Sequence, residues 1–184
     1  MTQSDTIQTL AELTTRYGAP RQSSTSKIQD SLSEAMQNWL KHSPFFMMAS
    51  ATASGLDCSP RGDAPGKAFH ILDQHTIAIP DRRGNNRIDT LRNILEDPRV
   101  GLVFLIPGIE EALRIKGQAS ISVKPDLLKQ FTLDGEEPAT VILISITAAY
   151  VQNARAVRSA KLWDDDFIAS AQQLPNANEL SNSA

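Results

Sequence analysis

The sequence contains a single cysteine, Cys58, and this scarcity limits the kinds of site that the chain can form. One thiol can make no disulfide within the chain and no cysteine-based metal cluster, a usage that fits a reducing compartment. The three histidines, His42, His70 and His75, include no pair at the helical spacing of a metal site. We therefore expect no bound metal.

Long hydrophobic runs and an excess of one charge are also absent. The longest apolar run, residues 100–106, is far too short to span a bilayer, and the first five residues lack the basic start of a signal peptide. The 18 basic residues nearly balance the 21 acidic ones, so no broad basic surface for nucleic acid is expected. The sequence thus predicts a cytoplasmic protein with neither a membrane nor a nucleic-acid partner.

Hydrophobic residues make up 41% of the 184 residues, which is enough for one sizeable core. Ile28, Leu32, Met36 and Trp39 with Leu40 recur at helical spacing and predict a helix near the N-terminus, from about residue 28. We expect a single domain with three zones: an N-terminal helical extension packed on the core (1–44), a β-rich part (45–163), and a C-terminal helix with a frayed tail (164–184).

Short apolar runs separated by turns are typical of an antiparallel sheet or a small barrel. Six such runs predict strands, over residues 45–51, 67–72, 76–79, 100–106, 112–122 and 140–151. Two helices are expected between them, one over residues 88–97 and a short one that begins near Pro125. The fold class is therefore mainly β with flanking helices, an α+β protein.

The most informative segment is a cationic loop that joins the strand ending near Ile79 to the helix after it. The loop carries three arginines, Arg82, Arg83 and Arg87. Their guanidinium groups could neutralise a phosphate and donate forked hydrogen bonds to its oxygens. These residues predict an anion site at the end of the strand.

Glycine and asparagine in the same loop also favour an anion site. Gly84, Asn85 and Asn86 tolerate the left-handed backbone that turns amide groups inward. Asn85 or Asn86 could cap the following helix, whose free N–H groups attract an anion. A solvated turn without a ligand would use the same residues, so the loop alone leaves both interpretations open.

Five segments stand in a specific order along the chain: Ser59–Gly66, Ile79–Ile94, Phe104–Gly108, Leu113–Ala119 and Ala160–Trp163. Their order and spacing resemble the flavin mononucleotide (FMN)-binding split barrels related to pyridoxamine 5'-phosphate oxidase, and in particular a bacterial subfamily of them. The resemblance extends from Phe45 to Trp163.

This resemblance implies a homodimer of six-stranded antiparallel split barrels, with FMN in clefts at the subunit interface. The cationic loop would face the flavin phosphate, and the strand end from Ser59 to Asp63 would lie beside the isoalloxazine ring. The cofactor-binding residues that it implies are Ser59, Arg61, Gly62, Asp63, Pro80, Asp81, Arg82, Arg83, Asn86, Arg87, Arg114 and Trp163.

Two of these residues have an alternative role that the sequence leaves open. Arg114 interrupts an otherwise apolar strand, so its charge belongs either to the flavin site or to a solvated barrel exterior. Trp163 could pack in the core, whereas in the related oxidases an aromatic residue from the C-terminal region can approach the flavin.

The resemblance implies an FMN-dependent oxidoreductase that acts on a small molecule, with hydride transfer at the flavin N5 atom and NADH or NADPH as a possible donor. If Arg61 lies near the ring, its charge would stabilise the anionic reduced flavin and raise the reduction potential. No catalytic side chain is predicted. A flavin-binding or flavin-storage protein without catalysis is the alternative, and a barrel that binds a different anion is a weaker one.

The sequence departs from the true pyridoxamine 5'-phosphate oxidases at its C-terminal end. Those enzymes carry an arginine and histidine arrangement there that recognises the phosphate of the substrate. This chain has no histidine after His75. The sequence therefore does not predict oxidation of pyridoxamine 5'-phosphate itself.

Overall fold

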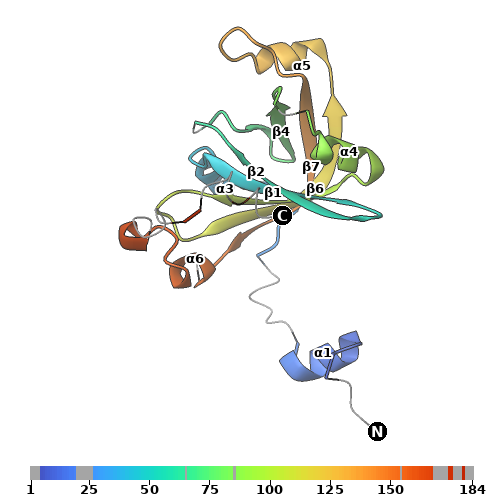
Figure 1. Ribbon diagram of the computed structural model, residues 1–184, viewed down its shortest axis with the longest axis vertical. Coiled ribbons are helices and arrows are strands. Elements are labelled where there is room, and N and C mark those ends of the chain that lie inside the picture. The colour runs from blue at the N-terminus through green and yellow to red at the C-terminus, as the bar shows by residue number, and fades with distance from the viewer. Residues whose placement is uncertain are drawn as a thin grey trace.

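The fold is built around one antiparallel sheet with the strand order β2-β1-β5-β6-β7-β4-β3 (Figure 1). The computed structural model describes residues 5–19, 27–64, 66–84, 86–153, 155–167, 174–175 and 180. The strands of these described parts are β1 Phe45–Thr52, β2 Gly55–Gly62, β3 His70–Asp73, β4 Thr76–Asp81, β5 Arg99–Leu105, β6 Ala112–Ser122 and β7 Thr140–Gln152. The sheet is strongly curved but not closed, because β2 and β3 remain at its two edges.

The seventh strand, β2, was not among the six that apolar runs predict. It pairs only with β1, from Thr52↔Gly55 to Phe45↔Gly62, and it is an edge strand. Its side chains are polar and alternate between exposed and half-buried, so they form no apolar run. Pro60, which has no N–H to donate, is compatible with an edge strand. The prediction of an antiparallel barrel-like sheet is confirmed, with one strand more than expected.

The core lies inside the curve of the sheet. Alternate residues of β1 point into it, with Phe46 and Met48 fully buried, as the two-residue period of a strand requires. Phe46, Phe69 and Phe104 form an aromatic cluster whose ring centroids lie 4.8–5.7 Å apart. Edge-to-face and offset contacts at such distances favour aromatic packing.

Two helices cover this core. In α4 (Asp89–Glu96), Thr90 and Ile94 are buried against the sheet. In α3 (Glu34–Leu40), Met36 and Leu40 are buried, and the Ser33 hydroxyl caps the helix by accepting a hydrogen bond from the Met36 amide. Helical spacing predicted a longer helix from about residue 28, but Gln29 instead pairs with Ala149 in an isolated β-bridge.

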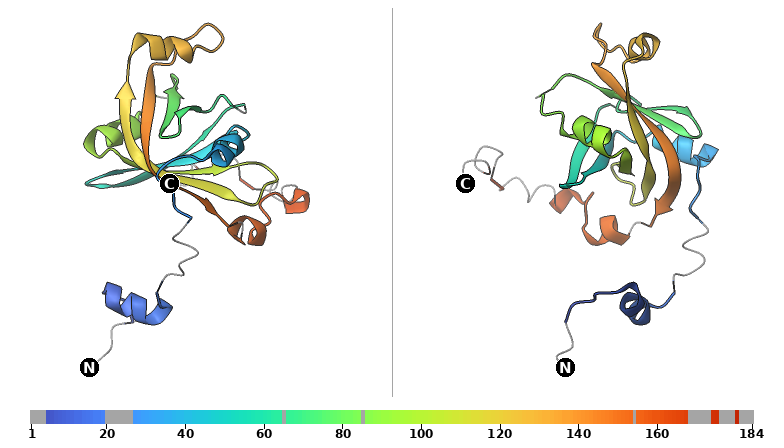
Figure 2. Two further views of the ribbon diagram at one scale, coloured as in Figure 1. Left: turned by 180° about the vertical axis from the view of Figure 1, so that it is seen from behind. Right: turned by 90° about the vertical axis from the view of Figure 1, so that its right-hand side faces the viewer.

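The helix α1 (Leu10–Tyr17) stands apart from the sheet in all three views (Figures 1 and 2). None of its residues is buried, in contrast with the packed faces of α3 and α4. No helix in the described ranges is long and apolar enough to cross a membrane.

Two further helices of the described residues lie at the ends of the long β6–β7 hairpin (Figure 1). The short helix α5 (Pro125–Gln130) begins at the predicted proline and leads into Phe131, which packs against Ala78 and Val141. After β7 comes α6 (Arg155–Ser159), where the Arg158 guanidinium donates a 2.7 Å hydrogen bond to Glu110. Most of the predicted C-terminal helix and tail, residues 164–184, lies outside the described residues.

Candidate functional site

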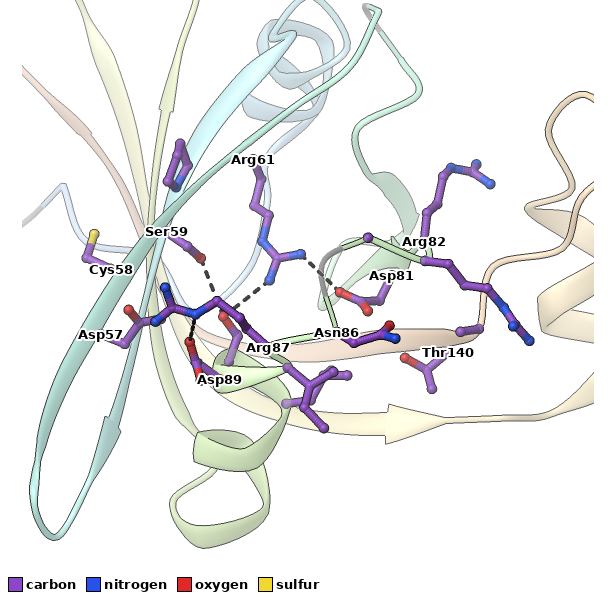
Figure 3. Close-up of a pocket in the computed structure, with 17 residues that line it drawn as sticks. Asp57, Cys58, Ser59, Arg61, Asp81, Arg82, Asn86, Arg87, Asp89 and Thr140 are labelled. Atoms are coloured by element: carbon purple, nitrogen blue, oxygen red, sulfur yellow. Dashed lines mark hydrogen bonds and ion pairs between the residues drawn. The ribbon is translucent and has the colours of Figure 1, made fainter. Parts of the chain in front are cut away.

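A cavity of about 650 Å³ opens beside the edge strand β2 (Figure 3). Its walls come from β2, the end of β4, the cationic loop, the first turn of α4 and the start of β7. The lining residues are Asp57, Cys58, Ser59, Pro60, Arg61, Asp81, Arg82, Arg83, Gly84, Asn86, Arg87, Ile88, Asp89, Thr90, Leu91, Ala139 and Thr140. The cavity therefore joins the two segments, near 60 and near 85, that the sequence predicted to share a ligand.

Arg61 is the central side chain of one wall. Its Nη1 atom lies 3.0 Å from Asp81 Oδ1, and its Nη2 atom donates a 3.2 Å hydrogen bond to Thr90 Oγ1. The Ser59 hydroxyl lies 3.4 Å from the same Thr90 oxygen. One guanidinium thus ties β2 to the end of β4 and to the first turn of α4, as Figure 3 shows.

The three loop arginines have different partners. Arg82 donates a 3.1 Å hydrogen bond from Nη2 to the carbonyl oxygen of Phe131, which directs its charge toward the end of α5. Arg87 forms an ion pair with Asp89, with 2.9 Å between Nε and Oδ2. Arg83 is exposed and has no hydrogen bond or ion pair with the parts of the chain that the structure describes. The three groups therefore do not converge equally on one point.

The helix after the loop begins without the predicted asparagine cap. Ile88 occupies the N-cap position of α4 in a left-handed conformation, with φ of 51° and no side-chain hydrogen bond to the helix. Asn86 lies two residues earlier, with φ of 58°, and Asn85 is outside the described residues. The loop takes the left-handed backbone that was expected, but the N-cap position falls on Ile88 and not on Asn86.

The charges around the cavity do not cancel. Four arginines line it, together with three aspartates, Asp57, Asp81 and Asp89. Two of the arginines are neutralised in ion pairs with Asp81 and Asp89. The remaining positive charge on the loop side is available to attract an anion.

Several residues of the cavity were not predicted from the sequence. Thr90 is 4% exposed and links the strand β2 to the helix α4, yet nothing in its local sequence indicates contacts with residues 29 and 31 positions away. The Oγ1 atom of Thr140 is buried without a hydrogen-bond partner among the described residues. Other lining residues outside the twelve predicted contacts are Asp57, Cys58, Pro60, Gly84, Ile88, Asp89, Leu91 and Ala139. A buried unpartnered hydroxyl is a signal for a ligand that only a structure can give.

Seven of the twelve residues predicted to contact the cofactor line the cavity: Ser59, Arg61, Asp81, Arg82, Arg83, Asn86 and Arg87. Gly62 and Pro80 are sequence neighbours of lining residues and Asp63 is two positions from Arg61, but none of the three lines the cavity. A side chain at Gly62 would meet the Pro44 carbonyl oxygen at 3.3 Å, which explains a residue without Cβ at this strand end.

Arg114 and Trp163 lie elsewhere in the chain. The Arg114 guanidinium sits 5.3 Å from the centroid of the Tyr150 ring and donates a 3.0 Å hydrogen bond to Gln152 Oε1. The Trp163 indole N–H donates a 2.9 Å hydrogen bond to the carbonyl oxygen of Ile109. Neither residue lines the cavity of its own chain, so their contact with a cofactor stays a prediction.

One titratable group next to the cavity wall is perturbed. Burial lowers the pKa of His70, and the positive charge of Arg82 lowers it further. The His70 ring lies 4.4 Å from the Phe131 ring, between centroids. Among the described residues no group of three or more His, Cys, Asp or Glu side chains could hold a metal ion.

Comparison with protein families gives one match that covers more than half of the chain. The family described as pyridoxamine 5'-phosphate oxidase matches residues 32–153. These residues include α3, the whole sheet and every residue that lines the cavity. None of the curated proteins matches the sequence.

Solved structures share the fold at low sequence identity. A candidate pyridoxamine 5'-phosphate oxidase from Lactobacillus delbrueckii is 20% identical, with a TM-score of 0.54 over 66% of this chain and 95% of that one. A similar candidate from Listeria innocua is 15% identical, with a TM-score of 0.52 over 65% and 97%. HupZ from Group A Streptococcus is 17% identical, with a TM-score of 0.50 over 62% and 89%.

Proposed function

Because this chain belongs to the pyridoxamine 5'-phosphate oxidase family, we propose that it binds FMN in the cavity beside β2 and acts as an FMN-dependent oxidoreductase on a small molecule. The observation that carries the proposal is the cavity itself. It combines an excess positive charge on the loop side with a neutralised, hydrogen-bonding wall on the side of β2. A ligand with a phosphate at one end and a polar ring at the other fits this division.

The loop side of the cavity suits a phosphate. Arg83 is a cation without a protein partner among the described residues, and it can donate forked hydrogen bonds to phosphate oxygens. The orphaned hydroxyl of Thr140 on β7 lies in the same wall region as Asn86 (Figure 3). A phosphate would give both groups an acceptor, and satisfying a buried donor removes a desolvation cost.

The opposite side, with Ser59 and Arg61, suits an uncharged polar ring. The charge of Arg61 is balanced by Asp81, so this wall offers hydrogen bonds without a strong net field. Leu91 and Pro60 add apolar surface to the lining. Cofactor pockets generally combine apolar walls with a few well-placed polar groups.

When bound, the flavin would supply hydride transfer at its N5 atom. The residues of the chain would bind and orient it: Arg83 and Asn86 at the phosphate, and Ser59 and Arg61 at the ring. We assign no catalytic residue, because Asp81 and Asp89 are both engaged by arginines and neither is a free general base. The small-molecule substrate would enter from the open side of the cavity.

We further propose that two copies of the chain form the functional unit. A row of residues directly opposite one another crosses the outer face of the sheet: Met47, Val103, Arg114 and Tyr150. Facing residues of paired strands point to the same side of a sheet, so this row presents half-buried apolar side chains outward. A second copy on this face would bury them and would bring Arg114 of each subunit to the interface.

The decisive experiment is a titration of the purified protein with FMN, in which the quenching of flavin fluorescence measures binding. We expect tight binding by the unaltered chain and a loss of about tenfold or more in Arg83→Gln, because a hydrogen bond to a charged group contributes roughly 1.5–3 kcal/mol. The control is Arg16→Gln, which makes the same change on the detached helix α1.

The two variants separate a specific phosphate contact from a general charge effect. Equal losses in Arg83→Gln and Arg16→Gln would show that only net charge matters, and would contradict the phosphate site. An unaltered protein that is colourless after purification and fails to bind added FMN would overturn the proposed cofactor.

A flavin-binding protein without catalysis is the second candidate. The observation that favours it is that both carboxylates nearest the loop, Asp81 and Asp89, are held by arginines. Mixing the FMN-loaded protein with NADH or NADPH under anaerobic conditions separates the two. Bleaching of the flavin at a catalytically useful rate supports the oxidoreductase. Flavin that is bound but stays oxidised with both donors supports a flavin-binding protein without catalysis.

A further inference from the structure

A chain of three polar side chains ends at the wall of the cavity. Arg61 Nη2 donates to Thr90 Oγ1 at 3.2 Å, and Thr90 Oγ1 lies 3.4 Å from Ser59 Oγ. Thr90 is buried, at 4% exposure, Ser59 is half-buried, and both belong to the cavity lining. The three residues come from two elements, β2 and α4.

The direction of these hydrogen bonds follows from what each group can donate. A guanidinium has donors only, so Thr90 Oγ1 must accept from Arg61. The proton of the Thr90 hydroxyl then needs an acceptor, and Ser59 Oγ is the one within reach among the described residues. If Ser59 donated instead, the proton of the buried Thr90 hydroxyl would have no acceptor among the described residues, which carries the cost of an unsatisfied donor.

Ser59 therefore accepts from Thr90, and its own proton is left to donate elsewhere. Because Ser59 lines the cavity, a ligand bound there can accept this proton. A serine hydroxyl normally rotates to suit its ligand, as donor or as acceptor. In this site the contact with Thr90, 3.4 Å long, favours the orientation in which Ser59 donates to a ligand, and oriented donors of this kind give polar sites their discrimination.

We propose that Ser59 recognises its ligand as a hydrogen-bond donor. Thr90 is the positioning residue: it accepts a hydrogen bond from Arg61 and donates one to Ser59, which leaves the Ser59 proton for the ligand. The proposal rests on the proposed function, since it concerns the ring side of the same cavity. The matching ligand group is an acceptor on a heterocycle edge, either a carbonyl oxygen or an unprotonated ring nitrogen. A ring that presented an N–H at this position would meet a second donor and bind more weakly.

A double-mutant cycle with FMN as the probe tests this inference. The variants are Ser59→Ala, which removes the donor, Thr90→Val, which keeps the shape but removes the hydroxyl, and the double variant. We expect each single variant to bind FMN about threefold to tenfold more weakly, the effect of one neutral hydrogen bond. The double variant should lose no more affinity for FMN than the single variant that binds FMN less tightly, because both changes break one chain of contacts.

Conservative and remote substitutions distinguish polarity from packing. Thr90→Ser retains the hydroxyl and should restore the affinity of the unaltered protein. Thr147→Val removes a hydroxyl that bonds to the Lys116 carbonyl oxygen away from the cavity, and should leave FMN binding unchanged. Infrared difference spectra give a second readout: the ring carbonyl or C=N stretching bands of bound FMN should shift in the same direction in Ser59→Ala and Thr90→Val.

The possible results separate the inference from the proposed function. Additive losses in the double variant, or unaltered affinity and bands in Thr90→Val, would overturn the polarity assigned to Ser59 while leaving FMN binding intact. Failure of the unaltered protein to bind FMN would overturn both. If Thr90→Val does not fold, the bands of Ser59→Ala and Thr90→Ser still decide, since unchanged bands in Ser59→Ala exclude a donated hydrogen bond.

Discussion

Single side chains of the cavity owe their roles to contacts between distant parts of the sequence. Arg61 and Asp81 are 20 positions apart, yet their side chains are 27% and 17% exposed and lie 3.0 Å from each other. A partly buried pair of this kind holds its geometry better than a surface pair, because water screens it less. Asp81 thus decides how much of the positive charge of Arg61 reaches a ligand.

Replacing Asp81 by Asn should release that charge. With FMN bound, we expect the reduction potential of Asp81→Asn to rise by about 30 mV, equivalent to about 1.4 kcal/mol in favour of the reduced, negatively charged flavin. Spectroelectrochemical titration measures the shift. Glu96→Gln, which makes the same change of charge on the exposed side of α4, serves as the control, and an equal shift there would assign the effect to net charge alone.

The sequence predicted well which residues line the cavity. It predicted less well which partner each of their side chains contacts. Arg82, Arg83 and Arg87 were expected to act together because they share one loop. In the structure Arg82 is held by the carbonyl oxygen of Phe131, 49 positions away, which only the fold brings close, and Arg87 is held by its near neighbour Asp89. Thr90 and Thr140 were missed for the same reason, since a single hydroxyl carries no local signal of the contacts it will make.

Among the elements, the long β6–β7 hairpin contains a glycine, Gly117, at which an added Cβ atom would clash with the neighbouring strand. Its register shifts between Lys116 and Gly117, which marks a β-bulge. A Cβ atom at Gly117 would lie 2.5 Å from the Ser145 carbonyl oxygen and 2.7 Å from a methyl carbon of Ile144. The backbone of β7 can approach β6 this closely only because residue 117 has no side chain.

Gly117→Ala should therefore destabilise the protein by about 1–3 kcal/mol, the usual cost of forcing extra atoms into a packed site. Urea denaturation followed by circular dichroism measures the change. Gly101→Ala is the matched control, because a Cβ atom on that residue of β5 would meet nothing within 4 Å. Similar losses at both positions would mean that the close approach of β7 is not the cause.

The junction of α5 and the sheet gives a dependence of stability on pH. The pKa of His70 is lowered by burial and by Arg82, so the folded chain binds a proton at this site less readily than the unfolded chain. The stability that neutral His70 contributes is complete above its unfolded pKa of 6.5. It is lost as the pH falls below that value toward the folded pKa.

We expect His70→Gln to reduce the fall in melting temperature between about pH 7.5 and about pH 5.5, a range above most carboxyl titrations. Differential scanning fluorimetry in matched buffers measures it. His75→Gln, at the exposed turn before β4, should keep the dependence of the unaltered protein. A pH dependence that is identical in all three proteins would exclude His70 as its source.

Prediction of the elements succeeded where a strand carries an apolar run and failed where it does not. The strands β1, β4, β5, β6 and β7 were expected at close to their observed bounds, because each buries alternate or consecutive apolar residues. Strand β2 buries none, and its pairing with β1 depends on the hairpin between Thr52 and Gly55. Polar edge strands resemble loops in a single sequence.

At the scale of the whole molecule, the family match confirms the resemblance that five short segments indicated. The order of those segments reflects the topology, since Ser59–Gly66 and Ile79–Ile94 meet at the cavity while Leu113–Ala119 crosses the middle of the sheet. What the sequence of one chain does not define is the surface that a second copy would cover. That surface depends on side chains from four strands.

A charged residue in the outer row should prevent dimer formation. We expect the unaltered protein to sediment as a dimer at micromolar concentration and Met47→Arg to sediment as a monomer, because the new charge would be buried without a partner in the row that already holds Arg114. Analytical ultracentrifugation decides. Gln130→Arg, on the exposed end of α5, is the control, and a dimer that persists in Met47→Arg would place the interface elsewhere.

The single thiol of the chain makes the cavity chemically addressable. Cys58 is free, exposed and part of the cavity lining, and no second cysteine competes for a reagent. A maleimide fluorophore would therefore attach at one known point without any engineering. A ligand in the cavity would change the emission of that label or slow the reaction of Cys58 with the maleimide. Either signal could be used to screen small molecules for binding to the cavity.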